Sequence, residues 1–361
     1  MNFMKKVLFV SRDYTIKRDG GSAVVKRNLF LLKQLFDEVT EFRIPIPSLF
    51  TRCKNILLME SYGNTRILKN EAIKHLTKTY DLVFFDSSLY GGYLRLFAMK
   101  GFNVCCFYHN VEYKYYSDKY YISRKLQDRF MLPYIRYNEL LSTNYAAFRV
   151  TLNERDSSEL MKLYGKKADF LLPTSFDPLD VNWLNSQIDS QNTPYILFVG
   201  SNFYANVEGI DFFLKEVAPY INCNVKIVGN VCEVFKHKKL PSNVLLIGMV
   251  DDLTSYYVNA LCVIAPIFSG SGLKTKTIEA FRYGKRIIGT KESFVGVPSE
   301  YYSIMGEVCS TAEDFIESIN SLSSYACQYI NLEILDLFNK LYSNQAIEKR
   351  FKDFLIANRV L

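Results

Sequence analysis

Short apolar runs alternate with longer amphipathic stretches along the first half of the chain. The run "KVLFVS" at 6–11 has the uniform apolar character of a buried strand, and residues 20–36 place apolar side chains at helical spacing. Such alternation is typical of a parallel sheet covered by helices, so the pattern predicts an α/β fold. Further strand-like runs, each leading into a helical stretch, lie at 80–87, 102–109 and 146–153.

The alternation of apolar runs and amphipathic stretches is interrupted once and then resumes. Residues 173–193 are rich in Pro, Ser, Asn and Asp and have no clear period, which predicts an interdomain linker. We therefore expect two Rossmann-like, doubly wound domains, at 1–172 and 194–338. The strand-like runs of the second half lie at 195–201, 224–230, 243–250, 261–267 and 286–290, with predicted helices at 207–221, near 252–260 and at 331–357.

Length and composition exclude several classes of protein. The 361 residues suffice for two domains, and no run of eighteen apolar residues is present to span a membrane. The apolar part of "MNFMKKVLFVSRDY" is too short for a secretory signal, so we expect a cytoplasmic protein. The eight cysteines form no CxxC pair and only three histidines accompany them, which favours small buried hydrophobic side chains over metal ligands or disulfides.

The charge is unevenly distributed. Residues 1–175 hold 28 Lys and Arg against 17 Asp and Glu, a net charge of +11, whereas the remainder holds 16 against 20, a net charge of −4. A basic half suits an anionic partner, such as a membrane surface, a lipid phosphate or a nucleic acid. Uneven charge on an ordinary solvated surface is the alternative.

The segment "GSGLKTKTIEAFRYGK" at 270–285 is the strongest candidate for chemistry. It lacks the Gly that a Walker A loop needs before its Lys-Ser/Thr pair, because Thr275 stands there. It does follow a predicted strand and open a helix, where unpaired amides and the helix dipole favour an anion. Lys274, Lys276 and Glu279 would suit a nucleotide diphosphate, the lysines binding phosphates and the carboxylate binding ribose hydroxyls. A surface helix start with solvated lysines is the alternative.

Two other features follow predicted strands. His109, Asn110 and Glu112 in "FYHNVEY" can hydrogen-bond sugar hydroxyls or a developing charge, although such a histidine is often structural. Gly20 and Gly21 allow a phosphate or sugar to approach the backbone. No G-x-G-x-x-G follows the first strand, which argues against a dinucleotide, and no ligand spacing or Asp-x-Asp pair suggests a metal.

Taken together, these segments resemble the GT-B retaining glycosyltransferases that use nucleotide sugars, particularly the bacterial surface-polysaccharide branch of the large family four. The stretch 266–290 is the most specific match. The other segments similar to the family, in the expected order, are "DGGSAVVKRNLFLLKQL", "YHNVEY", "VTLNERDSSELMKLYG", "LFVGSNFYANVEGIDFFLKEVAP" and "FNKLYSNQAIEKRF".

The resemblance implies a GT-B fold, two Rossmann-like domains facing a central cleft, with a C-terminal helix at 339–361 that packs back on the first domain. It would make Glu279 the ribose acceptor and Lys274 and Lys276 the diphosphate clamp, with His109 close to the transferred sugar. These four are the expected catalytic residues. The remaining expected substrate-binding residues are Gly20, Gly21, Asn110, Glu112, Gly200, Ser201, Asn202, Gly270, Ser271, Gly272, Leu273 and Thr275.

The chain departs from the family pattern at two places. Ser271 stands where the family has the first Glu of its paired acidic motif. The stretch "GSNFYANVEG" also lacks the Arg and Lys that many members carry there, so the lysines of 270–285 would substitute.

The resemblance implies transfer of a sugar from a nucleotide-diphosphate sugar to a glycan or lipid-linked glycan, with retention and without metal or cofactor, in bacterial capsule, exopolysaccharide or lipopolysaccharide synthesis. The acceptor domain would meet an anionic membrane through Lys17, Arg18, Lys26 and Arg27, on the inner face of the plasma membrane. A non-catalytic GT-B-like subunit that binds nucleotide sugars is the alternative. A nucleic acid is not an expected partner, because no recognition motif accompanies the basic residues.

Overall fold

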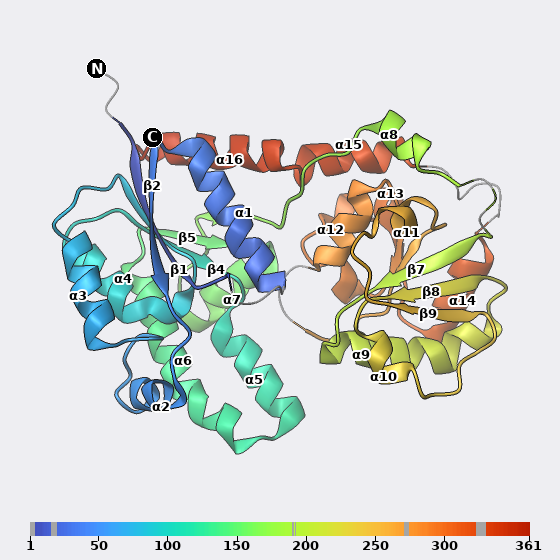
Figure 1. Cartoon of the computed structure of the whole chain (residues 1–361), viewed down its shortest axis with the longest axis horizontal. Coiled ribbons are helices and arrows are strands. Elements are labelled where there is room, and N and C mark those ends of the chain that lie inside the picture. Colours follow the sequence, from blue (N-terminus) through green and yellow to red (C-terminus); the bar gives the residue numbers. More distant parts are fainter. Residues whose placement is uncertain (1–3, 16–19, 190, 192, 271–273, 323–329) are drawn as a thin grey trace. The chain divides into compact units, whose positions relative to one another are not determined.

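The computed structural model describes residues 4–15, 20–189, 191, 193–270, 274–322 and 330–361 (Figure 1). The chain divides into two compact units. Unit 1 consists of Met1–Pro173 together with Ile347–Leu361, and unit 2 of Thr174–Ala346. The chain therefore returns to unit 1 within its last helix, and each unit is an α/β structure built on one parallel sheet.

Unit 1 contains a six-stranded sheet in the order β2-β1-β3-β4-β5-β6, in which all neighbouring strands pair in parallel. Strands β3 and β4 are buried along their whole length, as expected for strands covered by helices on both faces. The strands are β1 (Lys6–Arg12), β2 (Glu38–Ile44), β3 (Leu82–Phe85), β4 (Val104–Tyr108), β5 (Phe148–Thr151) and β6 (Phe170–Leu171).

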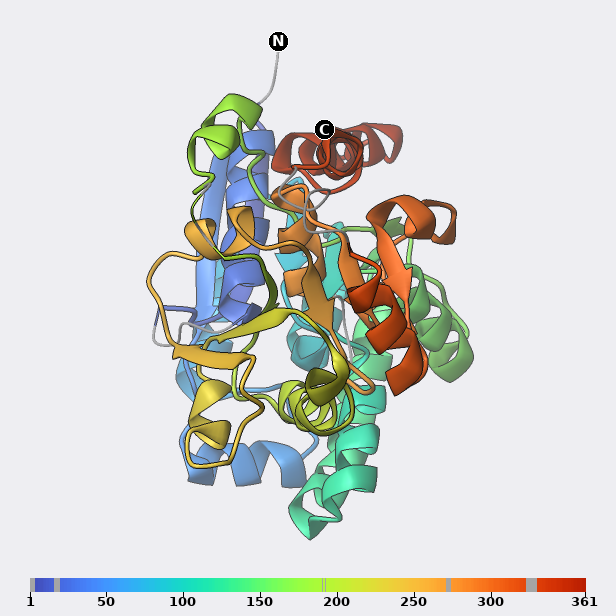
Figure 2. The same ribbon diagram turned by 90° about the vertical axis from the view of Figure 1, so that its right-hand side faces the viewer.

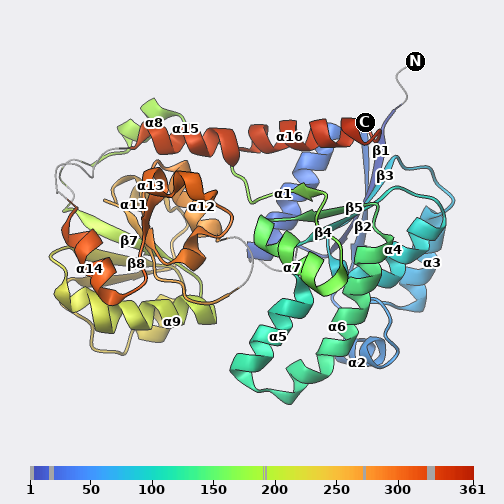
Figure 3. The ribbon, with the colours of Figure 1, turned by 180° about the vertical axis from the view of Figure 1, so that it is seen from behind.

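The helices of unit 1 connect these strands, and two of them form a hairpin that extends from the sheet, as Figure 3 shows for α5 and α6. The helices are α1 (Gly20–Leu35), α2 (Leu49–Leu57), α3 (Arg66–His75), α4 (Gly91–Met99), α5 (Glu112–Ser123), α6 (Leu126–Tyr145) and α7 (Glu154–Tyr164).

Unit 2 contains a second parallel sheet, in the order β12-β11-β10-β7-β8-β9. Its strands are β7 (Tyr195–Val199), β8 (Asn224–Val228), β9 (Val244–Gly248), β10 (Val263–Ala265), β11 (Ile287–Gly289) and β12 (Gly306–Val308). Its helices are α8 (Val181–Ser186), α9 (Tyr204–Phe212), α10 (Cys232–Phe235), α11 (Thr254–Val258), α12 (Thr275–Arg282), α13 (Tyr302–Met305), α14 (Ala312–Asn320) and α15 (Leu332–Leu341), and α16 (Asn344–Ala357) leads back into unit 1.

The predicted α/β class is confirmed, and each strand-like run of the sequence contains a strand. Three strands and one helix differ. Edge strands β2, β6 and β12 had no strand prediction, because the pattern "EVTEFRI" of β2 mixes charged and apolar residues and the other two strands have only two and three residues. The helix expected over 331–357 is two helices, because Tyr342 and Ser343 interrupt it where Ser343 pairs with Phe176.

Helix α16 packs on unit 1 through aromatic side chains. Phe351 is fully buried, and its ring centroid lies 6.5 Å from that of Phe84 and 5.3 Å from that of Phe170. Phe354 lies 5.6 Å from Phe148 in an edge arrangement. These contacts join the end of the chain to strands β3, β5 and β6, so α16 is part of the core of unit 1.

Both sheets have a point at which the strand order reverses. In unit 1 this point lies between β1 and β3, and in unit 2 between β7 and β10. In open parallel sheets the loops leaving the two strands at such a point diverge, and ligands bind in the resulting crevice at the carboxyl ends of the strands. In the part of the chain described, no helix combines the length and apolarity needed to cross a bilayer.

Truncation of the α16 anchor should destabilise unit 1. Phe351→Ala removes a fully buried ring and leaves a cavity, which we expect to lower the free energy of unfolding by about 3–5 kcal/mol. Urea denaturation followed by far-UV circular dichroism measures this. The control is the neighbouring exposed residue Lys352. Lys352→Ala should change the free energy of unfolding by less than about 0.5 kcal/mol. Equal midpoints for the two variants would contradict the assignment of α16 to the core.

Candidate functional sites at the two sheet edges

The first candidate site lies in unit 2, where β10 ends and α12 begins. Gly270 has a φ of +117°, a conformation that favours glycine, and Thr275 is exposed in the first turn of α12. The expected binding residues Ser271, Gly272 and Leu273 lie outside the described residues. The described part of this segment therefore consists of Gly270 and the start of the helix with its two lysines.

Lys274, directly before α12, is held by an ion pair. Its Nζ lies 2.9 Å from Oε1 of Glu292, and its side chain is only 11% exposed. This differs from the alternative reading of the sequence, a surface helix start with solvated lysines. The ammonium group is fixed in place by a carboxylate from the segment after β11, so a phosphate bound here would meet a cation whose position is already determined.

Lys276, in the first turn of α12, is enclosed by an amide and an aromatic ring. Its Nζ donates a hydrogen bond of 2.6 Å to Oδ1 of Asn206 and lies 4.0 Å from the centre of the Phe198 ring. Burial, reinforced by the neighbouring charge of Lys274, lowers the pKa of Lys276 to about 7. Lys276 can therefore exchange a proton near neutral pH, and an anion at this place would favour its charged form.

Glu279 lies one turn further along α12. Its Oε2 accepts a hydrogen bond of 3.0 Å from the hydroxyl of Tyr257, which stacks on Tyr283 with 4.7 Å between ring centroids. Burial raises the pKa of Glu279, and the bond from Tyr257 opposes that shift. The carboxylate is thus positioned by a buried tyrosine.

The loop after β7 joins this site through Asn206. Asn206 accepts from Lys276 with its Oδ1 and donates with its Nδ2 to the backbone oxygen of Ser201 at 2.9 Å. The backbone N–H of Asn202 donates to Asn230. A Cβ at Gly200 would lie 2.6 Å from the Phe198 ring, so only glycine fits there. The expected residues Gly200, Ser201 and Asn202 therefore lie in the same region of unit 2 as Lys276.

The second candidate site lies in unit 1, at the carboxyl ends of β3 and β4. Nε2 of His109 lies 2.9 Å from Oδ2 of Asp86 and 3.0 Å from the backbone oxygen of Asp86. Both partners are acceptors, so Nε2 carries the proton that is shared with them. Nδ2 of Asn28 donates to the other carboxylate oxygen of Asp86 at 2.6 Å. The orientation of the imidazole is set by a buried carboxylate that is itself held by an amide.

A cavity of about 300 Å³ opens beside His109. Glu112 lies at the first position of α5, and burial together with the charge of Glu139 raises its pKa to about 7. Buried Glu139 accepts from the backbone N–H groups of Glu112 and Tyr113 and from Tyr164, so it fixes the start of α5. The cavity is lined by Arg12, Tyr62, Asp86, Ser87, Leu89, Tyr90, His109, Asn110, Glu112 and Tyr116.

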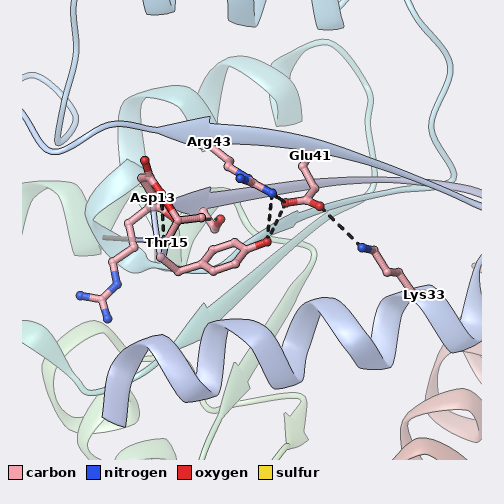
Figure 4. Close-up of polar contacts among 8 residues, drawn as sticks. Asp13, Thr15, Lys33, Glu41 and Arg43 are labelled. Carbon is pink, nitrogen blue, oxygen red and sulfur yellow. Dashed lines mark hydrogen bonds and ion pairs between the residues drawn. The ribbon is translucent and has the colours of Figure 1, made fainter. Parts of the chain in front are cut away.

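Gly20 and Gly21 begin α1, and the helix is joined to the lining of this cavity through Ser22. Arg12, which lines it, donates to Ser22 at 3.3 Å. The start of the loop that leads from β1 to these glycines is anchored by the polar network in Figure 4. In this network the Tyr14 hydroxyl donates to Glu41 at 3.0 Å, Arg43 binds both of them, and Glu41 also lies 3.7 Å from Lys33.

The structure thus places the expected site residues in two sets. His109, Asn110, Glu112 and the two glycines belong to unit 1, and the remaining described ones belong to unit 2. Asp86, Asn28, Asn206 and Tyr257 were missed in the sequence. Asp86 directly follows the apolar run "LVFF", so a search of every strand end would have found it. The other three lie inside helices, where no sequence signal separates them from ordinary polar residues.

Two further expectations need correction. Arg27 does not present its charge to a surface, because it donates to the backbone oxygens of Pro173 and Leu172, and burial lowers its pKa to about 10. Cys53 is exposed, although most of the described cysteines are buried. Among the described residues, no three His, Cys, Asp or Glu side chains gather as a metal site would require.

Comparison with known proteins shows which family part of the chain is similar to. Residues 193–324 match the family model described as "Glycosyl transferases group 1". Over this length, 132 of the 361 residues, the chain is similar to a group 1 glycosyltransferase domain. The domain holds the described residues around Lys276, and the resemblance inferred from the sequence is therefore confirmed at the level of family and fold.

The whole chain has the GT-B fold of glycosyltransferases. It matches the sucrose-phosphate synthase of Thermosynechococcus elongatus with a TM-score of 0.72 at 16% identity, covering 98% of this chain and 99% of that one. It matches HepE of Anabaena, solved in complex with UDP, with a TM-score of 0.65 at 13% identity, covering 98% and 100%. A sequence relative, described as an uncharacterized 44.6 kDa protein in the cps region of Klebsiella pneumoniae, is 22% identical over 76% of both chains.

The enclosure of Lys276 predicts a particular pH dependence of stability. An unfolded lysine keeps its proton to about pH 10.4, whereas folded Lys276 releases it near 7, so the unfolded state binds more protons between these values. Stability should therefore rise with pH there, by up to about 1.4 kcal/mol per pH unit. Lys276→Met should be more stable than the parent at pH 7 and should lose this slope, as thermal unfolding from pH 7 to 9 would measure.

The matched control is Lys215→Met, an exposed lysine of the same unit. It should follow the parent curve. Parallel curves for the parent and Lys276→Met would contradict the buried position of this ammonium group.

Proposed function

We propose that the protein transfers a sugar from a nucleotide-diphosphate sugar to a hydroxyl of a glycan or lipid-linked glycan, with retention and without a metal. The observation that carries the proposal is the pair of fixed ammonium groups, Lys274 and Lys276, at the start of α12 within a group 1 glycosyltransferase domain. HepE, solved with UDP, supports a uridine nucleotide as the first donor to test. The relative in a cps region supports a role in bacterial surface polysaccharide synthesis.

In the proposed reaction the glycosidic bond to the diphosphate breaks, and the bonding electrons remain on the departing phosphate oxygen. Lys274 and Lys276, with the backbone amides of α12, stabilise this growing negative charge more than they stabilise the bound donor. Because Lys276 has a pKa of about 7 in the free protein, the diphosphate would draw it into its charged form. Glu279 would accept hydrogen bonds from the ribose hydroxyls.

The acceptor is proposed to bind unit 1 in the cavity beside His109. Its hydroxyl would attack the anomeric carbon from the face on which the diphosphate leaves, and the hydroxyl proton would pass to the departing phosphate oxygen. His109, oriented by Asp86, would then lie against the transferred sugar, with Asn110 and Glu112 binding hydroxyl groups. An acceptor carried on a lipid would require unit 1 to approach an anionic membrane, in agreement with the net charge of +11 in residues 1–175.

The donor site is tested by thermal shift. With EDTA present, UDP, GDP, ADP and CMP are compared, and the matching nucleotide should raise the melting temperature, since at a hundredfold excess over Kd a ligand stabilises by about 2.7 kcal/mol. Glu279→Ala and Lys274→Ala should each reduce the shift, whereas Lys236→Ala, an exposed lysine of the same unit, should not. Absence of a shift with all four nucleotides would reject the donor site.

The role of unit 1 is tested by turnover. His109→Ala should lower the transfer rate by about 10²-fold or more while the nucleotide shift stays unchanged, because His109 belongs to the other unit. Asp86→Asn should lower the rate less, since the amide keeps the shape but not the charge that orients the imidazole. If both variants transferred sugar at the parent rate, the cavity beside His109 would not be the acceptor site, and a parent that binds nucleotide without transfer would favour the non-catalytic alternative.

A further inference from the structure

Helix α2 turns an apolar stripe outward. Phe50, Cys53 and Leu57 lie three and four residues apart, the spacing of one helix face, and all three are exposed, Phe50 to 81% and Leu57 to 82%. The buried side chain of this helix is the polar Asn55, which donates to the backbone of Asn64. An ordinary surface helix has the reverse arrangement, with its apolar face on the core. The stripe thus points to a partner outside unit 1.

The apolar surface continues from α2 onto its neighbours. Met59, just after α2, and Tyr137 of α6 line two adjacent hollows, one bordered by Leu132 and Leu140 of α6 and the other by Ile73 of α3. At the start of α6, Leu126 and Phe130 are 64% and 71% exposed and lie one helical turn apart. Figures 1, 2 and 3 show α2 and the turn between α5 and α6 at the same end of unit 1.

Basic side chains accompany this surface. The acids of residues 49–60 and 113–140 are neutralised or enclosed, because Glu60, Asp118 and Asp128 form ion pairs with Lys69, Lys114 and Lys119, and Glu139 is buried. The local charge is therefore strongly positive. The exposed cations of the same stretches are Arg52, Lys54, Arg124, Lys125, Arg129 and Arg136.

Aromatic side chains accompany the cations. The guanidinium of Arg124 lies 4.5 Å from the centre of the Tyr121 ring, and that of Arg136 lies 5.5 Å from the Tyr113 ring. Tyrosines and long basic side chains suit the boundary between headgroups and acyl chains, since they place an apolar body in the lipid and a polar end in water. A protein partner would instead need a shaped surface with matched hydrogen bonds.

We propose that α2, with Met59, the start of α6 and the hollows between them, is a docking surface for an anionic lipid bilayer. Phe50, Leu57, Leu126 and Phe130 enter the acyl boundary, and the surrounding arginines and lysines contact lipid phosphates. The charge complementarity selects an anionic bilayer over a second copy of this chain, because two copies would bring like-charged rims together. The inference rests on the proposed function only for its purpose, which is to bring unit 1 to a lipid-linked acceptor.

The surface is tested by co-sedimentation of the full chain with phosphatidylcholine vesicles that contain or lack phosphatidylglycerol. The parent should sediment with the anionic vesicles and much less with the neutral ones. Phe50→Ser combined with Leu57→Ser should lower the partition coefficient by about tenfold or more. Arg52→Gln combined with Lys54→Gln should lower it by roughly fivefold for each charge removed, on anionic vesicles alone.

Met99→Ser is the matched control, since Met99 is 66% exposed in the same unit but ends α4 at the amino edge of the sheet. It should bind vesicles as the parent does. A second readout places tryptophan in the stripe. Trp183 is the single tryptophan of the chain, so Phe50→Trp in a Trp183→Phe background reports only α2, and its emission should shift to the blue with anionic vesicles.

Each remaining outcome overturns the proposal. Parent-like sedimentation of the Phe50 and Leu57 variant would reject this surface, and equal binding to both vesicle types would reject its preference for anionic lipid. A dimer that this variant converts to a monomer, without vesicle binding by the parent, would assign the stripe to a second copy. Because these measurements need no nucleotide, failure of the donor test with intact vesicle binding would reject the proposed function and leave the docking surface standing.

Discussion

The decisive constraint is that both sheets are parallel and that their central strands are buried on both faces. Strands such as β3 and β4 have no exposed face on which to carry polar chemistry, so functional side chains can stand only at the strand ends. The order of strands then selects the place, since connections diverge at β1/β3 and at β7/β10. Asp86 and His109 follow β3 and β4 near the first point, and Gly200 and Gly270 flank the second. The location of both candidate sites is a consequence of topology.

At each edge, the charged groups are held by the protein before any ligand arrives. Lys276 is held in position by a hydrogen bond to Asn206 and by an aromatic ring. Lys274 is held by its ion pair with Glu292, and the imidazole of His109 is oriented by Asp86. Enclosing an ammonium group lowers its pKa and destabilises the free protein, and an anionic ligand reverses both effects. The cost of enclosing the ammonium group is therefore recovered when an anionic ligand binds. Groups that are already in position can stabilise charge that develops during a reaction, because the site does not have to reorganise at that moment.

The sequence predicted the fold well because burial on both faces produces uninterrupted apolar runs such as "LVFF" and "YILFV", which are visible without tertiary information. Edge strand β2 was not predicted, since one of its sides lacks a strand neighbour and its sequence mixes charged and apolar residues. The same limit applies to the sites. The two lysines at the start of a helix were visible in the sequence. The enclosure of Lys276 was not, because Asn206 lies seventy residues earlier in the chain and reaches Lys276 only through packing. Arg27 shows the opposite case, a basic residue that looks like a surface contact and instead ties α1 to the end of β6.

Ser271, in place of an acidic residue of the family motif, raises the question of catalyst or binder, and unit 1 bears on it independently. A protein that only binds a nucleotide sugar needs the features of unit 2. It has no use for a cavity in unit 1 whose histidine is oriented by a buried carboxylate, or for a second carboxylate, Glu112, whose pKa is raised to about 7 at the start of a helix. A carboxyl group that lines a cavity and has a raised pKa, as Glu112 does, is typical of functional sites, so unit 1 favours the catalyst.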